Sequence, residues 1–263
     1  GLIETLKDPV LKADVEKLVP AMEQAAARFE KDRPLLSEVK RLNGKATLEV
    51  IAPDWLRSIM GDEALVMFGR ITELNLNERT DGHKEPEAKP LTQRVHDETL
   101  KLLTGQDALR RLELSGTAVT SAGLVHLKDL TSLQFLNVCL TAVSDDEFEH
   151  LAKLTNMRRM TICASKITGS GFQHLNGMTQ LQSINLTGVA GAALTSVTTA
   201  AVRSSINGGD GFAALGQLDA SGLDLGSVTI DGDLGRILAG DATASTQAVG
   251  AVKVLSMGRY GTL

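Results

Sequence analysis

Apolar residues recur at a fixed interval in the middle of the chain, with polar residues between them. One short pattern, in which positions 1, 4 and 6 are apolar, occurs four times with a constant 24-residue period. The copies are Leu109-x-x-Leu112-x-Leu114, Leu133-x-x-Leu136-x-Val138, Met157-x-x-Met160-x-Ile162 and Leu181-x-x-Ile184-x-Leu186. A register kept this strictly indicates stacked repeats, in which each copy is one structural unit.

Each copy predicts a strand followed by a helical turn. Apolar positions 4 and 6 alternate with polar ones, as in a short strand with one buried face. The stretch after it, such as 121–130, places its apolar residues three apart. One coil cannot bury both faces by itself, but stacked coils share a continuous core. We therefore expect the strands at 112–114, 136–138, 160–162 and 184–186 to pair in parallel and in register.

The residues before the repeats predict a helical cap. Residues 1–45 carry apolar residues at helical intervals. We expect several short helices there, with Pro20 and Pro34 each near the start of one and Asn43-Gly44 ending the last. A strand is expected over 46–51. A solenoid needs such a cover over its first core layer, and a linker from an upstream domain is the alternative.

The repeat domain is expected over 46–190. Its first strand is Ile71-x-x-Leu74-x-Leu76, and the step from there to Leu109 is longer than the regular period. The additional residues form a charged insertion at 77–90. Insertions in repeats usually map to exposed loops.

After residue 190 the composition changes. Residues 191–263 are rich in Gly, Asp and Thr, contain no Glu and have a single Lys. Four apolar-Gly-x-apolar motifs with strand-forming neighbours predict an all-β solenoid, which we expect to be truncated. These motifs are Leu215-Gly-Gln-Leu218, Leu225-Gly-Ser-Val228, Leu234-Gly-Arg-Ile237 and Val249-Gly-Ala-Val252.

Composition excludes several classes of function. The 263 residues are 43% hydrophobic and 22% charged, with a net charge of −5 and 3% aromatic residues. There is no basic run, so we expect no nucleic-acid partner. No uninterrupted apolar stretch of about 18 residues occurs, so no membrane span is expected. The chain opens with Gly1 and stops abruptly at Leu263, so we expect it to be a fragment.

The two cysteines, Cys139 and Cys163, occupy the same repeat position one period apart. They should therefore be neighbours on adjacent coils. Equivalent residues on parallel strands have a suitable Cα separation but poorly aimed Cβ vectors. We expect two free thiols, with a bridge as the alternative.

The repeats resemble the 24-residue bacterial type of leucine-rich repeat, which carries a V-T-D-A-G-L-x-H-L segment. The three matching segments run from Val119 to Leu127, from Val143 to Leu151 and from Ile167 to Leu175. The usual Asn or Cys of the turn is replaced by Thr117, Thr141, Ser165 and Val189. The resemblance implies an α/β solenoid: a right-handed leucine-rich repeat horseshoe with an N-terminal helical cap, followed here by the truncated all-β solenoid. It also implies an interaction scaffold without catalytic residues.

Residues with possible chemistry do not combine into a site. His126, His150 and His174 recur at the repeat period, but a linear column does not converge on a metal ion, so we interpret them as structural. The stretch 208–216 begins like a calcium-binding repeat, yet Ala213 stands where the ligand Asp belongs. Asp231 and Asp233 flank a glycine, and Asp next to Gly is the usual composition of a turn. We expect no catalytic residues, no cofactor and no metal.

The remaining candidate is a surface. In a leucine-rich repeat, strand positions 3, 5 and 7 point away from the core onto the concave face. In the first repeat these are Glu73, Asn75 and Asn77, and position 7 of the later copies adds Ser115, Cys139, Cys163 and Thr187. We expect the partner-binding residues to be Arg111, Glu113, Phe135, Asn137, Arg159, Thr161, Ser183 and Asn185. Phe135 lies between two arginines, and aromatic and Arg residues are the usual anchors of interfaces.

The sequence therefore favours a non-catalytic scaffold that binds a protein or glycan partner through its concave strand face, outside the cytoplasm or at the cell surface. Two alternatives remain open at this point. One is a carbohydrate-cleaving enzyme with its site on the β-solenoid, and the other is a structural spacer between domains of a large surface protein.

Overall fold

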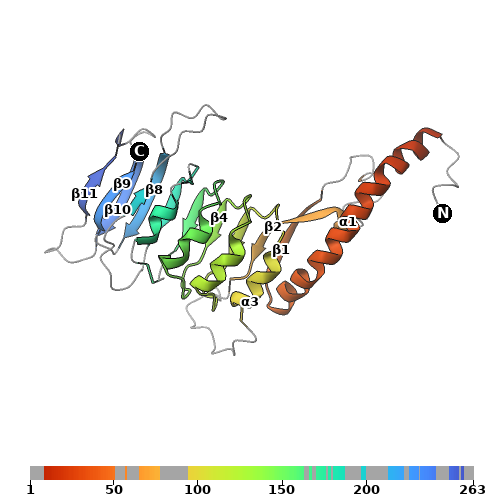
Figure 1. Ribbon diagram of the computed structural model, residues 1–263, viewed down its shortest axis with the longest axis horizontal. Coiled ribbons are helices and arrows are strands. Elements are labelled where there is room, and N and C mark those ends of the chain that lie inside the picture. The colour runs from red at the N-terminus through yellow and green to blue at the C-terminus, as the bar shows by residue number, and fades with distance from the viewer. Residues whose placement is uncertain are drawn as a thin grey trace.

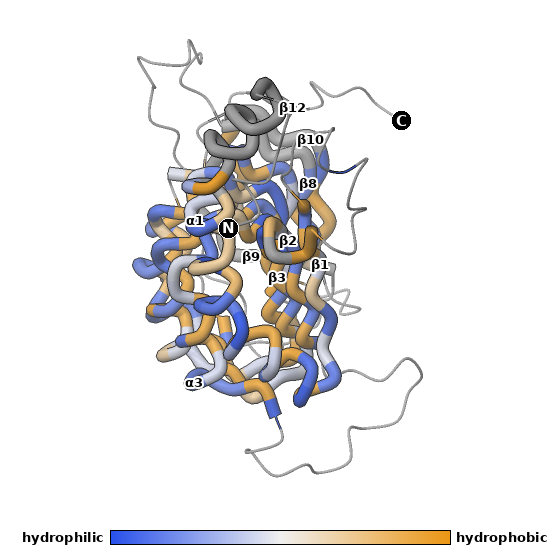
Figure 2. Tube along the Cα trace, turned by 90° about the vertical axis from the view of Figure 1, so that its right-hand side faces the viewer, coloured by the Kyte–Doolittle hydropathy of each residue, from blue (hydrophilic) through white to orange (hydrophobic). Residues whose placement is uncertain are grey.

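The fold is a row of stacked coils, with strands along one side and helical segments along the other (Figure 1). A computed structural model describes residues 9–50, 57, 65–77, 94–162, 166–167, 170–175, 177–178, 180–186, 197–199, 213–221, 225–230, 232–240, 249–254 and 256–257. Viewed along the row, strands β1 to β3 lie on one side and the helices α1 and α3 on the other (Figure 2).

The N-terminal cap is one long helix. Helix α1 spans Pro9–Arg41, so the prediction of several short helices is wrong. Pro20 and Pro34 both lie inside it. Proline lacks an N–H group and crowds the preceding turn, which normally breaks a helix. Burial compensates here, because Leu35 and Val39 are 1% and 4% exposed and belong to the main core.

Helix α1 ends as predicted. Asn43 adopts a left-handed conformation with φ of 56°, and the Gly44 N–H donates to the Val39 carbonyl at 2.8 Å. These contacts satisfy carbonyl groups at the end of the helix and reverse the chain. Strand β1, Lys45–Val50, follows and pairs antiparallel with β2, Gly69–Asn75. The cap therefore contributes a helix and an edge strand.

The four predicted strands pair in parallel and in register. They are β3 (Arg111–Glu113), β4 (Phe135–Asn137), β5 (Arg159–Thr161) and β6 (Ser183–Asn185). Leu112 pairs with Leu136, which pairs with Met160, and Met160 pairs with Ile184. The first repeat joins the same sheet, because β2 pairs in parallel with β3.

The return path of each coil is mainly 3₁₀-helical. The segments are η2 (Val66–Phe68), α3 (Asp97–Leu100), η4 (Lys101–Leu103), η5 (Ser121–Leu127), η6 (Asp145–Leu151) and η7 (Ser170–Leu175). A 3₁₀-helix has three residues per turn, so residues three apart share a face. This explains the apolar spacing of three: Leu124 and Leu127 are both fully buried. None of the described helices is long and apolar enough to span a membrane.

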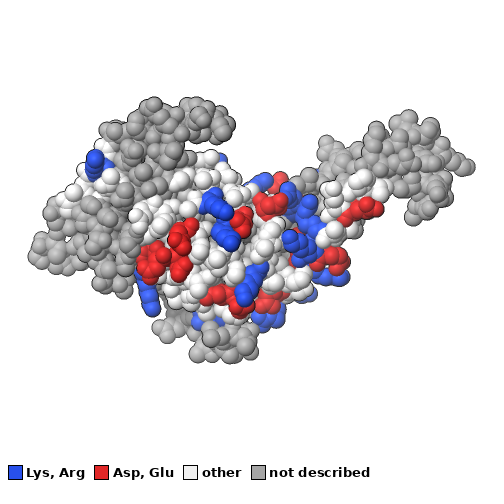
Figure 3. All heavy atoms as spheres, in the orientation of Figure 1, with Lys and Arg blue, Asp and Glu red and all other residues white. Residues whose placement is uncertain are grey.

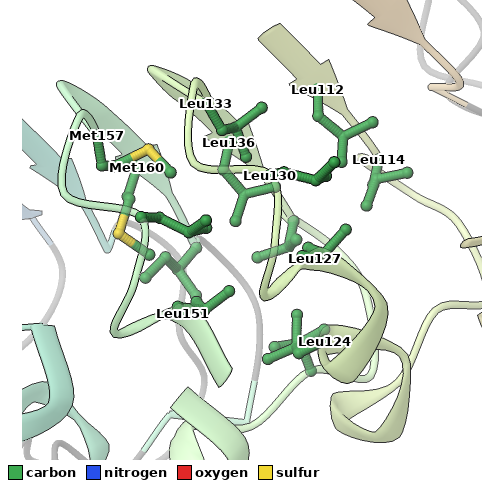
Figure 4. Packing of buried hydrophobic residues seen from close by; sticks show 14 of the residues in the cluster. Leu112, Leu114, Leu124, Leu127, Leu130, Leu133, Leu136, Leu151, Met157 and Met160 are labelled. Carbon is green, nitrogen blue, oxygen red and sulfur yellow. The ribbon is translucent and has the colours of Figure 1, made fainter. Parts of the chain in front are cut away.

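The core runs continuously between strands and helical turns. Strand residues such as Leu112 and Leu136 and helical residues such as Leu124 and Leu151 point into the same space (Figure 4). Phe148 and Phe172 lie edge to face, with ring centroids 5.8 Å apart. Because every coil fills the layer between its two neighbours, no coil is stable alone.

Hydrogen bonds along the helical side tie each coil to the next. In each case a side chain at the start of a helical segment accepts a backbone N–H of the following coil. The Thr120 N–H donates to Asp97 Oδ1 at 2.8 Å, the Ser144 N–H to Ser121 Oγ at 2.8 Å, and the Gly171 N–H to Asp145 Oδ2 at 2.9 Å. Asp145 is fully buried. A buried carboxylate held this way stabilises the stacking only while its partners remain in place.

The turns after β3 and β4 use hydroxyl groups. Thr117 Oγ1 donates to the Leu114 carbonyl at 2.7 Å, and Thr141 Oγ1 donates to the Val138 carbonyl at 2.6 Å. Threonine thus satisfies the buried backbone at this turn in the place of asparagine. Ser165 and Val189 lie outside the described residues.

The C-terminal strands continue the same sheet. β8 (Ala213–Ser221), β10 (Gly232–Gly240) and β12 (Ser256–Met257) extend it, while β7 (Val197–Thr199), β9 (Leu225–Ile230) and β11 (Val249–Lys253) form a second parallel sheet. The apolar-Gly motifs pair two by two. Leu215 lies opposite Leu234 in the first sheet, and Leu225 lies opposite Val249 in the second. This all-β part is therefore a solenoid of parallel coils.

The boundary predicted at 190/191 falls among residues outside the described parts, as does most of the insertion at 77–90. On either side of that boundary, β6 pairs in parallel with β8. Leu218, Ala220 and Val228 also belong to the same hydrophobic core as the leucine-rich repeats. The two parts of the chain therefore share one sheet and one core.

Cys139 is disulfide-bonded, so the expectation of free thiols is wrong for this residue. The other cysteine of the sequence, Cys163, lies outside the described residues. Our expectation assumed strand geometry, but Cys139 lies just past β4, where Leu140 has φ of 56° and the backbone leaves the pleat. Stacked coils are about 4.8 Å apart, which suits the Cα separation of a disulfide.

We expect thiol titration of the unreduced, denatured protein to find no free thiol and to find two after reduction, since the chain has two cysteines. Reduction should also lower the thermal midpoint, because a bridge across one repeat is worth roughly 3 kcal/mol in the chain-entropy model. Cys139→Ser should show the lower midpoint with or without reductant. Two free thiols before reduction would contradict the assignment.

Candidate partner-binding face

The eight residues predicted to bind a partner form two adjacent columns across the sheet. Position 3 of β3 to β6 supplies Arg111, Phe135, Arg159 and Ser183, and position 5 supplies Glu113, Asn137, Thr161 and Asn185. Residues in register on parallel strands lie about 4.8 Å apart. We call these two columns the concave strand face.

After β3 and β4, position 7 does not belong to this face, although the sequence placed it there; in the first repeat the equivalent Asn77 is exposed. Ser115 is 2% exposed and Cys139 is 4% exposed. The Gly116 N–H donates to the Cys139 carbonyl at 2.8 Å, and Gly116 has φ of 72°. The chain thus turns toward the core directly after position 6, which buries position 7 beneath the turn.

Phe135 is covered on one side of its ring. The Arg111 guanidinium lies 3.7 Å from the ring centroid. Arg111 Nη2 also donates to Glu113 Oε1 at 2.5 Å. A guanidinium over an aromatic face is attracted by the ring quadrupole, and the carboxylate fixes it there. The three side chains therefore form one preorganised group, and Phe135 is half-buried rather than bare.

Arg159, one coil further along, is exposed and has no ion pair or hydrogen bond to its side chain within the described part of the chain. The equivalent Arg111 is paired, and its neighbour Arg110 contacts Glu49 at 3.1 Å. Over the repeats, Lys and Arg alternate with Asp and Glu in the view of Figure 3. Although charges of both signs are mixed on this surface, no carboxylate of the described residues pairs with Arg159.

Arg111, Phe135 and Arg159 border a hollow of about 630 Å³ on the concave strand face. Six of its lining residues were predicted, and the other two are Gln182 and Gln217. Gln217 extends the position-3 column, because it pairs with Ser183 across β6 and β8, and Asp219 extends the other column beside Asn185. Polar side chains, one aromatic ring and two arginines therefore line a single depression.

Gln217 was missed although the sequence carried a signal for it. Leu215-x-x-Leu218 matches the strand motif of the earlier repeats, and Leu218 pairs with Ile184. The step from Ser183 to Gln217 is longer than the regular period. We assigned this motif to a separate solenoid because its distance from the previous copy breaks the repeat period. Two strands can nevertheless pair when the loop that connects them is longer.

The histidine column lies on the helical side, away from the concave strand face. His126, His150 and His174 are each half-buried in their 3₁₀ segments. His150 Nε2 lies 3.1 Å from Glu147 Oε2, and with Glu149 these groups offer three ligand atoms within 4.8 Å of one another. We interpret this cluster as an ordinary ion pair at the protein surface. The calcium-like stretch 208–212 and Asp231 lie outside the described residues.

Two solved structures resemble this one loosely. Internalin C2 from Listeria monocytogenes has 17% identity and a TM-score of 0.35, with 70% of this chain and 80% of that chain covered. An internalin (inlF) from the same organism has 16% identity and a TM-score of 0.33, covering 76% of this chain and 54% of the other, so this chain spans about half of its length. No protein-family model and no curated protein matches the sequence.

The assignment of the fold rests on the molecule's own geometry. Parallel strands in register at a 24-residue period, helical returns on the opposite side and one continuous leucine core define a leucine-rich repeat solenoid. It is capped by helix α1 and β1 at one end and continues into parallel β-coils at the other.

Proposed function

We propose that this protein is a non-catalytic leucine-rich repeat scaffold that binds a protein partner through its concave strand face. The observation that carries the proposal is the hollow beside Arg159, an exposed and uncompensated arginine next to the preorganised group of Arg111, Phe135 and Glu113. Repeat proteins commonly use such extended faces for binding.

The chemistry of the hollow favours a polypeptide segment that carries carboxylates. A guanidinium binds a carboxylate through two parallel hydrogen bonds, and this geometry is strong where water is excluded. The amide and hydroxyl groups of Thr161, Gln182 and Ser183 can exchange hydrogen bonds with a backbone. A glycan would stack best on a bare ring, but Arg111 already covers one face of Phe135. We therefore favour a protein over a glycan.

We further propose that the protein acts outside the cytoplasm. The disulfide at Cys139 supports this location, because structural disulfides form and persist in oxidising compartments and are rare in the cytosol. This proposal predicts that the protein carries its disulfide when isolated from the cell envelope or the medium.

The test is capture of a partner with the immobilised protein from the native cell envelope and its surroundings, followed by titration of that purified partner. Arg159→Ala and Phe135→Ala are each expected to weaken binding by about 2 kcal/mol, or roughly 30-fold, as anchors at the centre of an interface do. Both variants should keep nearly the wild-type thermal midpoint, since neither residue belongs to the core.

The matched control is Arg158→Ala. Arg158 is also exposed and adjacent in sequence, but it does not line the hollow. Arg158→Ala should lower the affinity for the partner no more than the loss of one positive charge elsewhere on the surface does. A partner whose affinity survives the double change Phe135→Ala and Arg159→Ala binds elsewhere, and the proposal would then be abandoned. If the immobilised protein captures no partner, this outcome favours the structural spacer.

A further inference from the structure

A second hollow, of about 290 Å³, lies between the cap helix and the first two repeats, apart from the concave strand face. Helix α1 forms one wall, the start of β2 another, and the turn after η4 the third. The charged and turn residues that line it are Arg28, Lys31, Asp32, Arg70, Gly105 and Asp107. The hollow thus joins parts of the chain that lie far apart in sequence.

The charges around this hollow do not cancel. Three cationic side chains face two carboxylates, which leaves one net positive charge (three minus two). One carboxylate is paired with a cation, because Asp107 Oδ1 contacts Arg70 Nη2. Asp32 Oδ1 accepts a hydrogen bond from the neutral Gln106 amide at 2.5 Å and keeps its negative charge. Arg28 and Lys31 form no ion pair within the described residues. Arg28 and Lys31 therefore exceed the remaining carboxylate, Asp32, by one positive charge, which is available to a negative group.

One donor in the hollow is buried without an acceptor. Arg70 Nε lies out of contact with solvent and has no hydrogen-bond partner, and it is the one such side-chain atom among the described residues. A buried donor without an acceptor destabilises a fold, because it has lost water and gained nothing. No water-sized space reaches this atom, so an oxygen atom of a ligand in the hollow would satisfy it only after the Arg70 side chain shifts toward the hollow.

The turn opposite α1 leaves room for the Lys31 ammonium group at the edge of the hollow. Gly105 has φ of 86°, a conformation that favours glycine. A Cβ atom on Gly105 would lie 2.5 Å from Lys31 Nζ, so the Lys31 ammonium group rests against the bare backbone of this turn. The glycine therefore lets the ammonium group lie against the turn, at the edge of the hollow.

We propose that this hollow binds a small oxyanion, a carboxylate or a phosphate group. Arg70 Nε and Lys31 Nζ donate hydrogen bonds to its oxygens, and Arg28 supplies the remaining charge. The bound anion bridges α1 and the first two repeats, so it ties the cap to the solenoid. Because a ligand that binds only the folded state stabilises it by mass action, occupancy should raise the thermal stability of the whole chain.

The test is a thermal-shift titration of the whole chain with potassium phosphate and with potassium acetate, each against potassium chloride of equal ionic strength. We expect at least one oxyanion to raise the midpoint saturably while chloride does not. In ¹⁵N-resolved spectra the same titration should shift the amide signals of Gly105 and Gln106. A response to phosphate alone identifies a tetrahedral ligand, and a response to acetate identifies a carboxylate.

Lys31→Gln removes one cation and should weaken the apparent affinity at least tenfold. Arg70→Lys keeps the charge but removes the Nε donor, and a similar loss there shows that the guanidinium geometry matters. Lys40→Gln is the matched control, because Lys40 is an exposed cation of the same helix outside the hollow. The proposal fails if neither oxyanion binds saturably, or if Lys31→Gln and Lys40→Gln weaken binding equally.

Discussion

Gly171→Ala is expected to destabilise the solenoid by about 3 kcal/mol or more, because the added methyl group meets backbone rather than a movable side chain. A Cβ atom at Gly171 would lie 1.8 Å from the Asp145 carbonyl oxygen. The same residue donates its N–H to Asp145 Oδ2 at 2.9 Å. Moving η7 away to relieve the overlap would break that hydrogen bond and leave a fully buried carboxylate short of a donor.

Gly177→Ala serves as the comparison for this change. There the nearest atoms to an added Cβ would be the Ala152 carbonyl oxygen at 3.4 Å and Thr155 Cγ2 at 3.7 Å. The methyl group fits, and alanine restricts the unfolded chain, so stability should stay within about 1 kcal/mol of wild type. Chemical denaturation followed by circular dichroism measures both. Equal midpoints for the two variants would show that the contact between η6 and η7 is loose.

Leu136→Ala is expected to cost about 2–5 kcal/mol, since it opens a cavity in the middle of the stack. Leu136 is 1% exposed, and its strand pairs with β3 on one side and β5 on the other. Each coil stabilises its neighbours, so the loss should spread along the array rather than stay local. We expect a lower denaturation midpoint and faster amide exchange in β3 and β5.

Leu140→Ala is the matched control, because it removes the same atoms from a leucine that is 44% exposed. Its effect should stay within about 0.5 kcal/mol. Glu113→Ala is less suitable as a surface control, because the Glu113 side chain is 13% exposed and pairs with Arg111. If Leu136→Ala and Leu140→Ala unfold at the same denaturant concentration, Leu136 does not pack in the core of the stack.

The periodic part of the fold could be predicted because a buried position must be apolar in every coil. Leu112, Leu136, Met160 and Ile184 fix the register of four strands by themselves. The cap was harder. Pro34 normally ends a helix, and only the burial of Leu35 and Val39 explains why α1 continues through it. That burial depends on tertiary contacts, which a local pattern does not contain.

The sequence predicted which residues share the candidate face but not how their side chains interact. Register alone places Phe135 between Arg111 and Arg159. The stacking of Arg111 on the ring and its bond to Glu113 depend on side-chain rotamers, for which the sequence has no signal. Ser115 was misplaced for a related reason: strand alternation was extended past Leu114, where Gly116 already turns the backbone inward.

The thin helical returns set how strongly the molecule bends. Strands in register repeat about every 4.8 Å, whereas packed α-helices need about 8–10 Å between axes, and that mismatch curls a solenoid into a tight arc. Here η5, η6 and η7 are 3₁₀-helices of six or seven residues, which are narrower than α-helices. The two sides of each coil therefore differ less in width, which favours a shallower arc than α-helical returns would give. Under the proposed function, a shallower arc favours a partner that lies along the strand face over one that the solenoid surrounds.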